Sequence, residues 1–192
     1  MSSALPHGEQ TTAAISEYQL SPYRVPLPLI RAGLTVKQAC ANANHRLGYL
    51  EDALFGAITG AIEVLAGLND DELRQRFPLD AWQGGAGTAI NMNLNEAIAA
   101  QAATAGAALS PLDHVNRHQS TNDVMPTALR VMLLRMLTEV EGAVEQLQAI
   151  VQDGENQYAD VLKVARTQLR DATVVSAGQQ FATWAGAVAR DR

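Results

Sequence analysis

One long stretch of helical periodicity constrains the fold of this chain more than any other feature. After Pro126, apolar residues follow one another at spacings of 4, 3, 4, 4, 3 and 4: Leu129, Leu133, Met136, Val140, Val144, Leu147 and Val151. The mean spacing is about 3.67 residues, close to one turn of α-helix. The stripe therefore predicts a long helix whose apolar face packs in a helical bundle.

The composition agrees with a helical protein. Hydrophobic residues make up 47% of the chain and charged residues 18%, which is typical of a folded domain rather than a disordered one. Aromatic residues account for only 5%, and small apolar residues, above all Ala, are abundant. Small side chains without runs of strand-forming residues favour closely packed helices, so we expect an all-α fold.

Charge and cysteine content exclude several classes of function. The chain has 20 acidic and 14 basic residues and a formal charge of -6, whereas nucleic-acid binding calls for a basic face. Cys40 is the only cysteine, so no intrachain disulfide can form. Residues 1–17 lack the apolar run of a signal peptide, and no stretch is apolar enough to span a membrane. We expect a cytoplasmic protein.

The sequence divides into three parts. Residues 1–33 contain Pro6, Pro22, Pro26 and Pro28 without a sustained period, which predicts an extended or partly disordered lead-in. Residues 34–125 form an N-terminal helical domain, which a capping box at residues 35–38 (TVKQ) is expected to open. Residues 126–192 form an incomplete central bundle that begins with the long helix.

The end of the chain predicts a further helix. The apolar face of the long helix is expected to continue through Leu162 and Ala165, followed by a polar connection over residues 166–175. A second capping box at residues 176–179 (SAGQ) then precedes a stripe containing Phe181 and Trp184. This stripe has no later partner in the sequence. We therefore expect either burial against another chain or, as the preferred alternative, the N-terminal part of a longer protein.

Three short segments place hydroxyl and amide side chains at expected helix starts: residues 85–88 (GAGT), 119–123 (QSTND) and 166–168 (RTQ). Free N–H groups and the positive end of the helix dipole favour an anion at such positions. The first segment lacks the ending of a phosphate loop, so uncharged donors suit a small carboxylate better than a nucleotide. Ordinary helix capping by Ser, Thr, Asn and Asp is the alternative interpretation.

Two further groups of polar residues stand out. Asn91, Asn93 and Asn95 are poor helix formers inside an expected helix, which predicts hydrogen bonds across a helix interface or beside a ligand. His114 and His118 are four residues apart, but no Asp, Glu or Cys completes a metal site at helical reach. From the residues alone, the chain is an anion-binding helical protein.

At the same three segments the sequence resembles the aspartase and fumarase superfamily, and within it the aspartate ammonia-lyases. Residues 77–88 (FPLDAWQGGAGT) with 91–96 (NMNLNE) resemble its first conserved region. Residues 113–123 (DHVNRHQSTND) with Pro126 and Thr127 resemble the second, and residues 166–172 (RTQLRDA) with 178–181 (GQQF) resemble the stretch leading into the central helices. The resemblance extends from about Thr35 to the end.

The resemblance implies a long-helix subunit that assembles into a tetramer with composite active sites. The reaction would be the reversible elimination of ammonia from L-aspartate to give fumarate, without a metal or an organic cofactor. It assigns Thr88, Ser120 and Thr121 to the carboxylate beside the carbon that loses its proton. Asn122 would contact the leaving amino group, and Thr167 would hold the other carboxylate.

Details of the motifs separate the possible substrates. Thr121 and residues 83–86 (QGGA) are similar to aspartases, and Gln168 stands where fumarases usually carry a His. Ala89, where aspartases commonly have Ser, and Val174-Val175, where the family usually has a Pro, depart from the pattern. A fumarase acting on malate and fumarate is the second choice, and a non-catalytic assembly module is a third.

The resemblance also implies that part of the machinery is missing. The mobile loop that supplies the family's catalytic serine, with its substrate-binding Lys, follows residue 192 in the family. We therefore expect that this chain alone does not catalyse elimination, and that it works with further copies or with a complementary C-terminal fragment.

Overall fold

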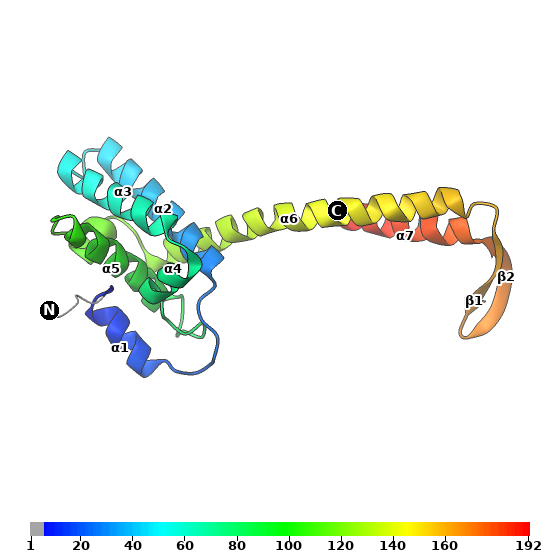
Figure 1. Ribbon diagram of the computed structural model, residues 1–192, viewed down its shortest axis with the longest axis horizontal. Helices are drawn as coiled ribbons and strands as arrows, with labels where there is room; N and C mark the ends of the chain where they lie inside the picture. Colours follow the sequence, from blue (N-terminus) through cyan, green and yellow to red (C-terminus); the bar gives the residue numbers. More distant parts are fainter. Residues whose placement is uncertain (1–5) are drawn as a thin grey trace. The chain divides into compact units, whose positions relative to one another are not determined.

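The computed structural model describes residues 6–192. The chain divides into two compact units, with the boundary between Leu133 and Leu134. The elements are labelled in Figure 1 except for one π-helical turn, η1. In chain order they are α1 (Glu9–Glu17), α2 (Leu27–Arg46), α3 (Asp52–Gly67), α4 (Asp70–Arg76), α5 (Thr88–Thr104), η1 (Pro111–Val115), α6 (Thr121–Gln157), β1 (Leu162–Thr167), β2 (Arg170–Ser176) and α7 (Ala177–Asp191). The expectation of a helical long-helix fold is confirmed, with one β-hairpin added.

The core of the first unit lies between α2, α3 and α5. Each helix contributes an apolar stripe at helical spacing, and the most deeply buried side chains include Leu34, Ile58, Leu65, Leu94 and Ile98. Gly33 lets α2 approach α5 closely, because a Cβ atom there would lie 2.7 Å from Cδ1 of Leu94. The opposite face of α2 packs Ala32 and Val36 against Val124 and Ala128 of α6.

The N-terminal segment differs from the expected extended lead-in. Residues 1–5 lie outside the described residues, but Glu9–Glu17 form α1 and α2 already begins at Leu27. Pro26 is the N-cap of α2, where the fixed φ of proline suits a helix start. Thr35 is consequently inside α2, where its hydroxyl donates to the carbonyl of Arg31, and the capping box expected at residues 35–38 is wrong.

A distant carboxylate explains why α1 forms. The buried side chain of Glu96 on α5 accepts hydrogen bonds from the backbone N–H groups of Gly8, Gln10 and Thr11 and from the Thr11 hydroxyl. These N–H groups have no partner within α1. Negative charge also stabilises the start of a helix, so the cap of α1 comes from a residue far away in sequence.

The second unit is a helical hairpin formed by the later part of α6 and by α7. A Cβ atom at Gly154 would lie 2.6 Å from the ring of Phe181, and one at Gly178 would lie 2.6 Å from the carbonyl oxygen of Glu155. Both glycines therefore permit close packing of the two helices. Phe181 also stacks on Tyr158, with ring centroids 5.5 Å apart. Part of the apolar face of α7 therefore packs on α6, earlier in the chain, an arrangement that the sequence analysis did not consider.

Residues 158–176 contain a β-hairpin in place of the expected helix continuation and polar connection. β1 and β2 are antiparallel, with Leu162 opposite Ser176 and Thr167 opposite Arg170. The capping box at the start of α7 is confirmed, because Ser176 Oγ accepts from the N–H of Gln179 and the Gln179 side chain accepts from the N–H of Ser176. Residues 162–164 and 173–175 (LKV and TVV) favour strands locally, and that preference outweighed the helical spacing.

The apolar stripe of α6 is largely uncovered within this chain. Met136, Val140 and Leu147 are 48%, 55% and 49% exposed. Single exposed apolar residues are ordinary, but a regular row of them along a helix is typical of a protein–protein contact. None of the helices within residues 6–192 combines the length and apolar content needed to cross a lipid bilayer.

Candidate functional site

The starts of α5 and α6 lie next to each other in the first unit. Thr88 is the first residue of α5 and follows Gly87, which has a φ of +81°. One turn later, the Nδ2 group of Asn91 donates to the hydroxyl of Thr121, the first residue of α6, at 3.1 Å. A Cβ atom on Gly87 would lie 3.4 Å from Cγ of Met125 on α6. Two of the three predicted segments are therefore brought together through their helix starts.

The backbone before α5 explains how its first turn becomes accessible. Gly85 and Gly87 both have positive φ values, which glycine adopts without steric penalty. Thr88 is exposed, and the first N–H groups of a helix have no intrahelical acceptor. The loop therefore presents a hydroxyl and N–H donors on one accessible helix end.

The turn that opens α6 presents a second set of donors. Ser120 precedes the helix, and its carbonyl accepts from the N–H groups of Asp123 and Val124. Its Oγ accepts from the N–H of Asn122 at 3.2 Å, which leaves the hydroxyl proton to be donated. Ser120 and Asn122 are exposed and Thr121 is half-buried. The segment caps its own helix and still offers donors outward.

A face of α2 that the sequence analysis did not identify holds this turn. Lys37 is 1% exposed, and its Nζ lies 2.9 Å from Oδ1 of Asn116 and 2.8 Å from Oε1 of Gln119. Two turns further along, Asn44 donates to the carbonyl of Arg117 and contacts Nδ1 of His118 at 2.9 Å. The detectable signal was two polar residues, seven apart, within an otherwise apolar helical stripe.

The electrostatics of Lys37 follow from its surroundings. Burial lowers the pKa of its ammonium to about 7, and the electrostatic interaction with Cys40 opposes this shift. Burial also raises the pKa of the Cys40 thiol, with Lys37 opposing and Asp123 adding to the shift. The ammonium is thus close to its titration point near neutral pH, while Cys40 stays a thiol.

The three asparagines of α5 are buried, as their unusual placement indicated. Asn91 donates to Thr121 and also to Oδ1 of Asn116 at 3.2 Å, and Asn93 donates to the carbonyl of Arg76 at 3.0 Å. Both residues therefore bond across helix interfaces, as expected. Asn95 is fully buried and its Nδ2 contacts only the sulfur of Met92 among the described residues, at 3.7 Å.

Thr167 and Gln168 belong to the second unit, so the helix starts of the first unit are built without them. Thr167 ends β1, and Gln168 and Leu169 form the two-residue loop between the strands. Their φ values are +50° and +64°, which is the left-handed region that side chains other than glycine rarely adopt. Strained backbone of this kind is often found at functional sites, so the hairpin tip remains a candidate.

The paired histidines form no metal site in the described part of the chain, where no group of three or more potential ligands is found. Nδ1 of His114 accepts from the N–H of Ser110, and Nδ1 of His118 contacts Asn44. His118 has a φ of +56°, so its backbone reverses the chain just before Gln119. Both histidines shape the approach to the turn.

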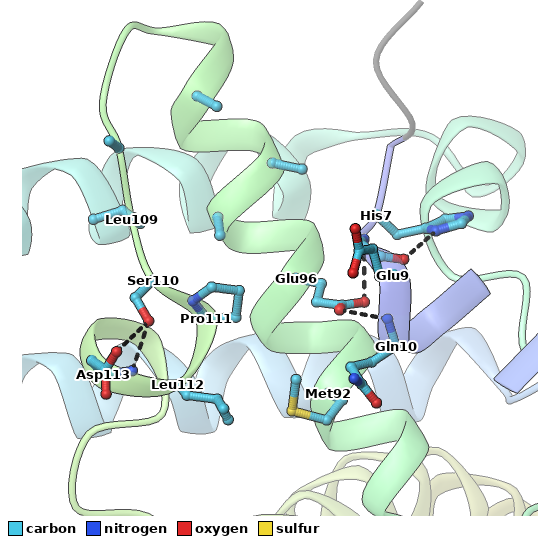
Figure 2. Close-up of a pocket in the computed structure, with 15 residues that line it drawn as sticks. His7, Glu9, Gln10, Met92, Glu96, Leu109, Ser110, Pro111, Leu112 and Asp113 are labelled. Carbon is cyan, nitrogen blue, oxygen red and sulfur yellow. Dashed lines mark hydrogen bonds between the residues drawn. The ribbon is translucent and has the colours of Figure 1, made fainter. Parts of the chain in front are cut away.

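A separate cavity of about 750 Å³ lies between the start of α1, α5 and η1. Figure 2 shows Glu96 between the lining residues, with its carboxylate directed to the start of α1, and Ser110 bonded to Asp113 on the other side. The Glu96 carboxylate and the Ser110 hydroxyl thus already have partners within the protein. The cavity is distinct from the helix starts that carry Thr88 and Ser120.

Comparison with known proteins identifies the fold. A family model described as a lyase matches residues 7–192. The chain belongs to this lyase family, within the aspartase and fumarase superfamily. The family match covers the paired helix starts, the hairpin and the long helix together.

Relatives of this lyase family are substantially similar in sequence and structure. The class II fumarate hydratases of Chromobacterium violaceum and Halobacterium salinarum are 40% and 41% identical, over 95% and 91% of this chain. The fumarate lyase:delta crystallin of Brucella melitensis, in its native form, superposes with a TM-score of 0.86 at 37% identity over 97% of this chain and 45% of its own. A class II fumarase from Schistosoma mansoni gives 0.88 at 28% identity, over 96% of this chain and 40% of its own.

These comparisons agree with one expectation, that the chain matches the N-terminal part of longer relatives, and revise another, the choice between aspartase and fumarase. The chain spans 41% of the Chromobacterium violaceum relative and 38% of the Halobacterium salinarum relative. Similar curated relatives include several class II fumarate hydratases, so the second choice, a fumarase-type enzyme, fits better than the aspartate ammonia-lyase. Local motif details around Thr121 and Gln168 had favoured the ammonia-lyase, whereas these relatives carry the name fumarate hydratase.

Proposed function

We propose that this chain supplies the carboxylate-binding helix starts of a class II fumarase-type hydro-lyase, which adds water reversibly to fumarate to give malate. The observation that carries the proposal is the meeting of two helix starts, joined by the hydrogen bond from Asn91 to Thr121. The names of the similar relatives support fumarate as the substrate.

The chemistry suits neutral donors. Loss of the weakly acidic proton from malate gives an enediolate that carries two negative charges on one carboxylate group. The N–H groups at the start of α5, with Thr88, Ser120 and Thr121, can donate to that group as its charge grows. Because these donors are fixed by the fold, little reorganisation is needed when the charge develops.

The other assigned residues complete the proposal. Asn122 would contact the group that leaves, which is water in a hydro-lyase, and Thr167 would bind the second carboxylate. Gln168 would lie beside the same carboxylate. The general base is proposed to lie outside residues 1–192, in the serine loop that follows this region in the family.

The proposal is tested by complementation. The chain is assayed alone and after co-expression with the remaining C-terminal segment of a class II fumarase, following fumarate consumption and malate formation. We expect turnover only in the complemented sample, reduced about 100- to 1000-fold by Ser120→Ala. Lys163→Ala, an exposed change outside the proposed site, serves as the control. Complemented protein that assembles but converts neither malate nor fumarate would contradict the proposal.

Aspartate remains a second candidate substrate because Gln168 stands where a fumarase is expected to carry His. The same complemented sample is given fumarate with ammonium ions. Formation of aspartate without malate would favour the ammonia-lyase. Assembly without either product would favour the non-catalytic module.

We also propose that the uncovered stripe on α6 joins this chain to further copies in a homo-oligomer. Leu134, Leu137 and Ile150, which add to the apolar surface of α6 outside the regular stripe, are 67%, 56% and 67% exposed, so their burial would remove apolar surface from water. Size-exclusion chromatography with light scattering tests this. Replacing Leu137 and Ile150 by Glu should shift an oligomer to monomer, and a monomeric wild-type chain would contradict the proposal.

A further inference from the structure

A buried ammonium lies behind the turn that opens α6. Nζ of Lys37 reaches Asn116 and Gln119, and both acceptors are carboxamide oxygens rather than carboxylates. Within residues 6–192 Lys37 takes part in no ion pair. Removing an ammonium from water without an opposite charge costs several kcal/mol, and an apolar side chain of similar length would avoid that cost.

The two acceptors of Lys37 shape the backbone that precedes Ser120. Nδ2 of Asn116 donates to the carbonyl of Gln119 at 3.1 Å, and Nε2 of Gln119 donates to the carbonyl of Val115 at 2.8 Å. Between them His118 has a positive φ value. Lys37 therefore fixes which end of each carboxamide faces α2, and so directs the opposite ends to the backbone of the turn.

The same ammonium is linked to the Thr121 hydroxyl. Oδ1 of Asn116 accepts from both Lys37 and Asn91, and the Nδ2 group of Asn91 donates to Thr121 as well. A hydrogen bond to a charged donor is stronger than one between neutral groups. Lys37 thus orients the amide of Asn116. Through its oxygen, this amide is linked to Asn91, the residue that joins the starts of α5 and α6.

We propose that Lys37 is a positioning residue, whose ammonium holds Asn116 and Gln119 so that the hydroxyls of Ser120 and Thr121 face the dicarboxylate. This inference rests on the proposed function for the identity of the ligand. The ordering of the turn itself does not depend on any ligand. Lys37 acts through the turn and does not touch the substrate.

The first experiment measures the turn without ligand. In the complete chain, ¹⁵N-labelled, the amide resonances and hydrogen exchange of residues 119–122 are compared in wild type and Lys37→Met, which keeps the length of the side chain but removes the charge. We expect large shifts and at least tenfold faster exchange at the turn, while amides of α3 are unchanged. Unchanged resonances and exchange at residues 119–122 in Lys37→Met would overturn the inference.

Chemical rescue separates the charge from the space it fills. Lys37→Cys is made in a Cys40→Ala background, alkylated while unfolded with 2-bromoethylamine, and refolded, which restores an ammonium at nearly the original length. Alkylation with 1-bromopropane gives a neutral control of similar size. Restoration of the wild-type turn by the first reagent only supports the positioning role, and equal restoration by both overturns it.

Kinetic measurements with fumarate distinguish the positioning role of Lys37 from the proposed function. Fumarate is titrated into the complemented enzyme carrying wild-type Lys37 or Lys37→Met, and KM and kcat are measured separately. A rise of at least tenfold in KM for the variant, with assembly unchanged, supports the inference. Turnover that is identical in both proteins contradicts it. Absence of turnover in the wild type, with the turn still ordered by Lys37, counts against the proposed function alone.

Discussion

The side-chain amide of Asn91 donates to the hydroxyl of Thr121 at 3.1 Å and thereby joins the first turn of α5 to the first turn of α6. The two residues are thirty positions apart; Thr121 belongs to the predicted segment 119–123, and Asn91 lies on the helix that the segment 85–88 begins. Asn91 is 2% exposed, so this bond forms away from solvent, where an unpaired donor is costly. It is the contact on which the candidate site depends.

Replacing Asn91 by Ala should destabilise the fold and disorder the site. The change removes the donor to the Thr121 hydroxyl and one of the two donors to Oδ1 of Asn116, which still accepts from Lys37. We expect the free energy of unfolding to fall by about 1–3 kcal/mol. Chemical denaturation measures the loss, and the amide resonances of residues 120–122 report the disorder.

Asn93→Ala is the matched control for that change. Asn93 is equally buried on α5 but donates to the carbonyl of Arg76, away from the helix starts. A similar loss of stability is expected, with the resonances of residues 120–122 unchanged. If both variants disturb the turn alike, the specific role of Asn91 is wrong.

The contribution of Lys37 to stability should depend on pH in a defined direction. Its pKa is about 7 in the folded chain and 10.5 in its ordinary state, so between these values the unfolded chain binds more protons. Stability must then rise with pH over this interval. The difference in unfolding free energy between wild type and Lys37→Met should move in favour of wild type by up to a few kcal/mol from pH 7 to pH 10.

The order of the turn at residues 119–122 should instead decrease as the pH rises from 7 to 10, because a neutral amine is a weaker donor than an ammonium. The unfolding free energy and the order of the turn are both measured in a Cys40→Ala background. His118 and Asp123 also line the groove beside Cys40, and are present in wild type and variant alike. A pH-independent difference between the two proteins would show that Lys37 does not titrate in this interval.

Gly154→Ala should weaken the packing of α7 on α6. The added methyl group would lie 2.6 Å from the ring of Phe181, and inserting a methyl group into packed surroundings typically costs about 1–3 kcal/mol. Faster hydrogen exchange of α7 amides measures the effect. Gly142→Ala, on the same helix in open space, should instead stabilise α6 by about 0.5–1 kcal/mol. Equal effects of the two changes would rule out the packing explanation.

Leu169→Gly should stabilise the β-hairpin. Leu169 is fully exposed at a φ of +64°, a conformation that is unfavourable for a branched side chain and free of strain for glycine. We expect the free energy of unfolding of the hairpin to rise by about 0.5–1 kcal/mol, as measured by following its thermal unfolding with NMR. Val174→Gly, at an exposed strand position of ordinary geometry, should destabilise it by about 1 kcal/mol. A loss of stability in Leu169→Gly would contradict the strain argument.

Local pattern was sufficient to identify most helices of this protein. Helical spacing after Pro126 located α6, the segments 85–88 and 119–123 marked the starts of α5 and α6, and the Ser176 box began α7. These features involve residues within a few positions of one another, whose interactions depend on helix geometry alone. The motifs at Thr88 and Ser120 were visible for the same reason.

Tertiary structure decided what local pattern could not. α1 depends on Glu96, more than eighty residues away, and the hairpin replaced a helical continuation that periodicity alone favoured. In the sequence Lys37 was only a member of an expected capping box, and the packing of α2 shows that it is buried against Asn116 and Gln119. The sequence by itself determined where α5, α6 and α7 begin and which donors stand there. Only packing, which brings distant polar groups together and excludes water from them, decided which donors meet and what holds them in place.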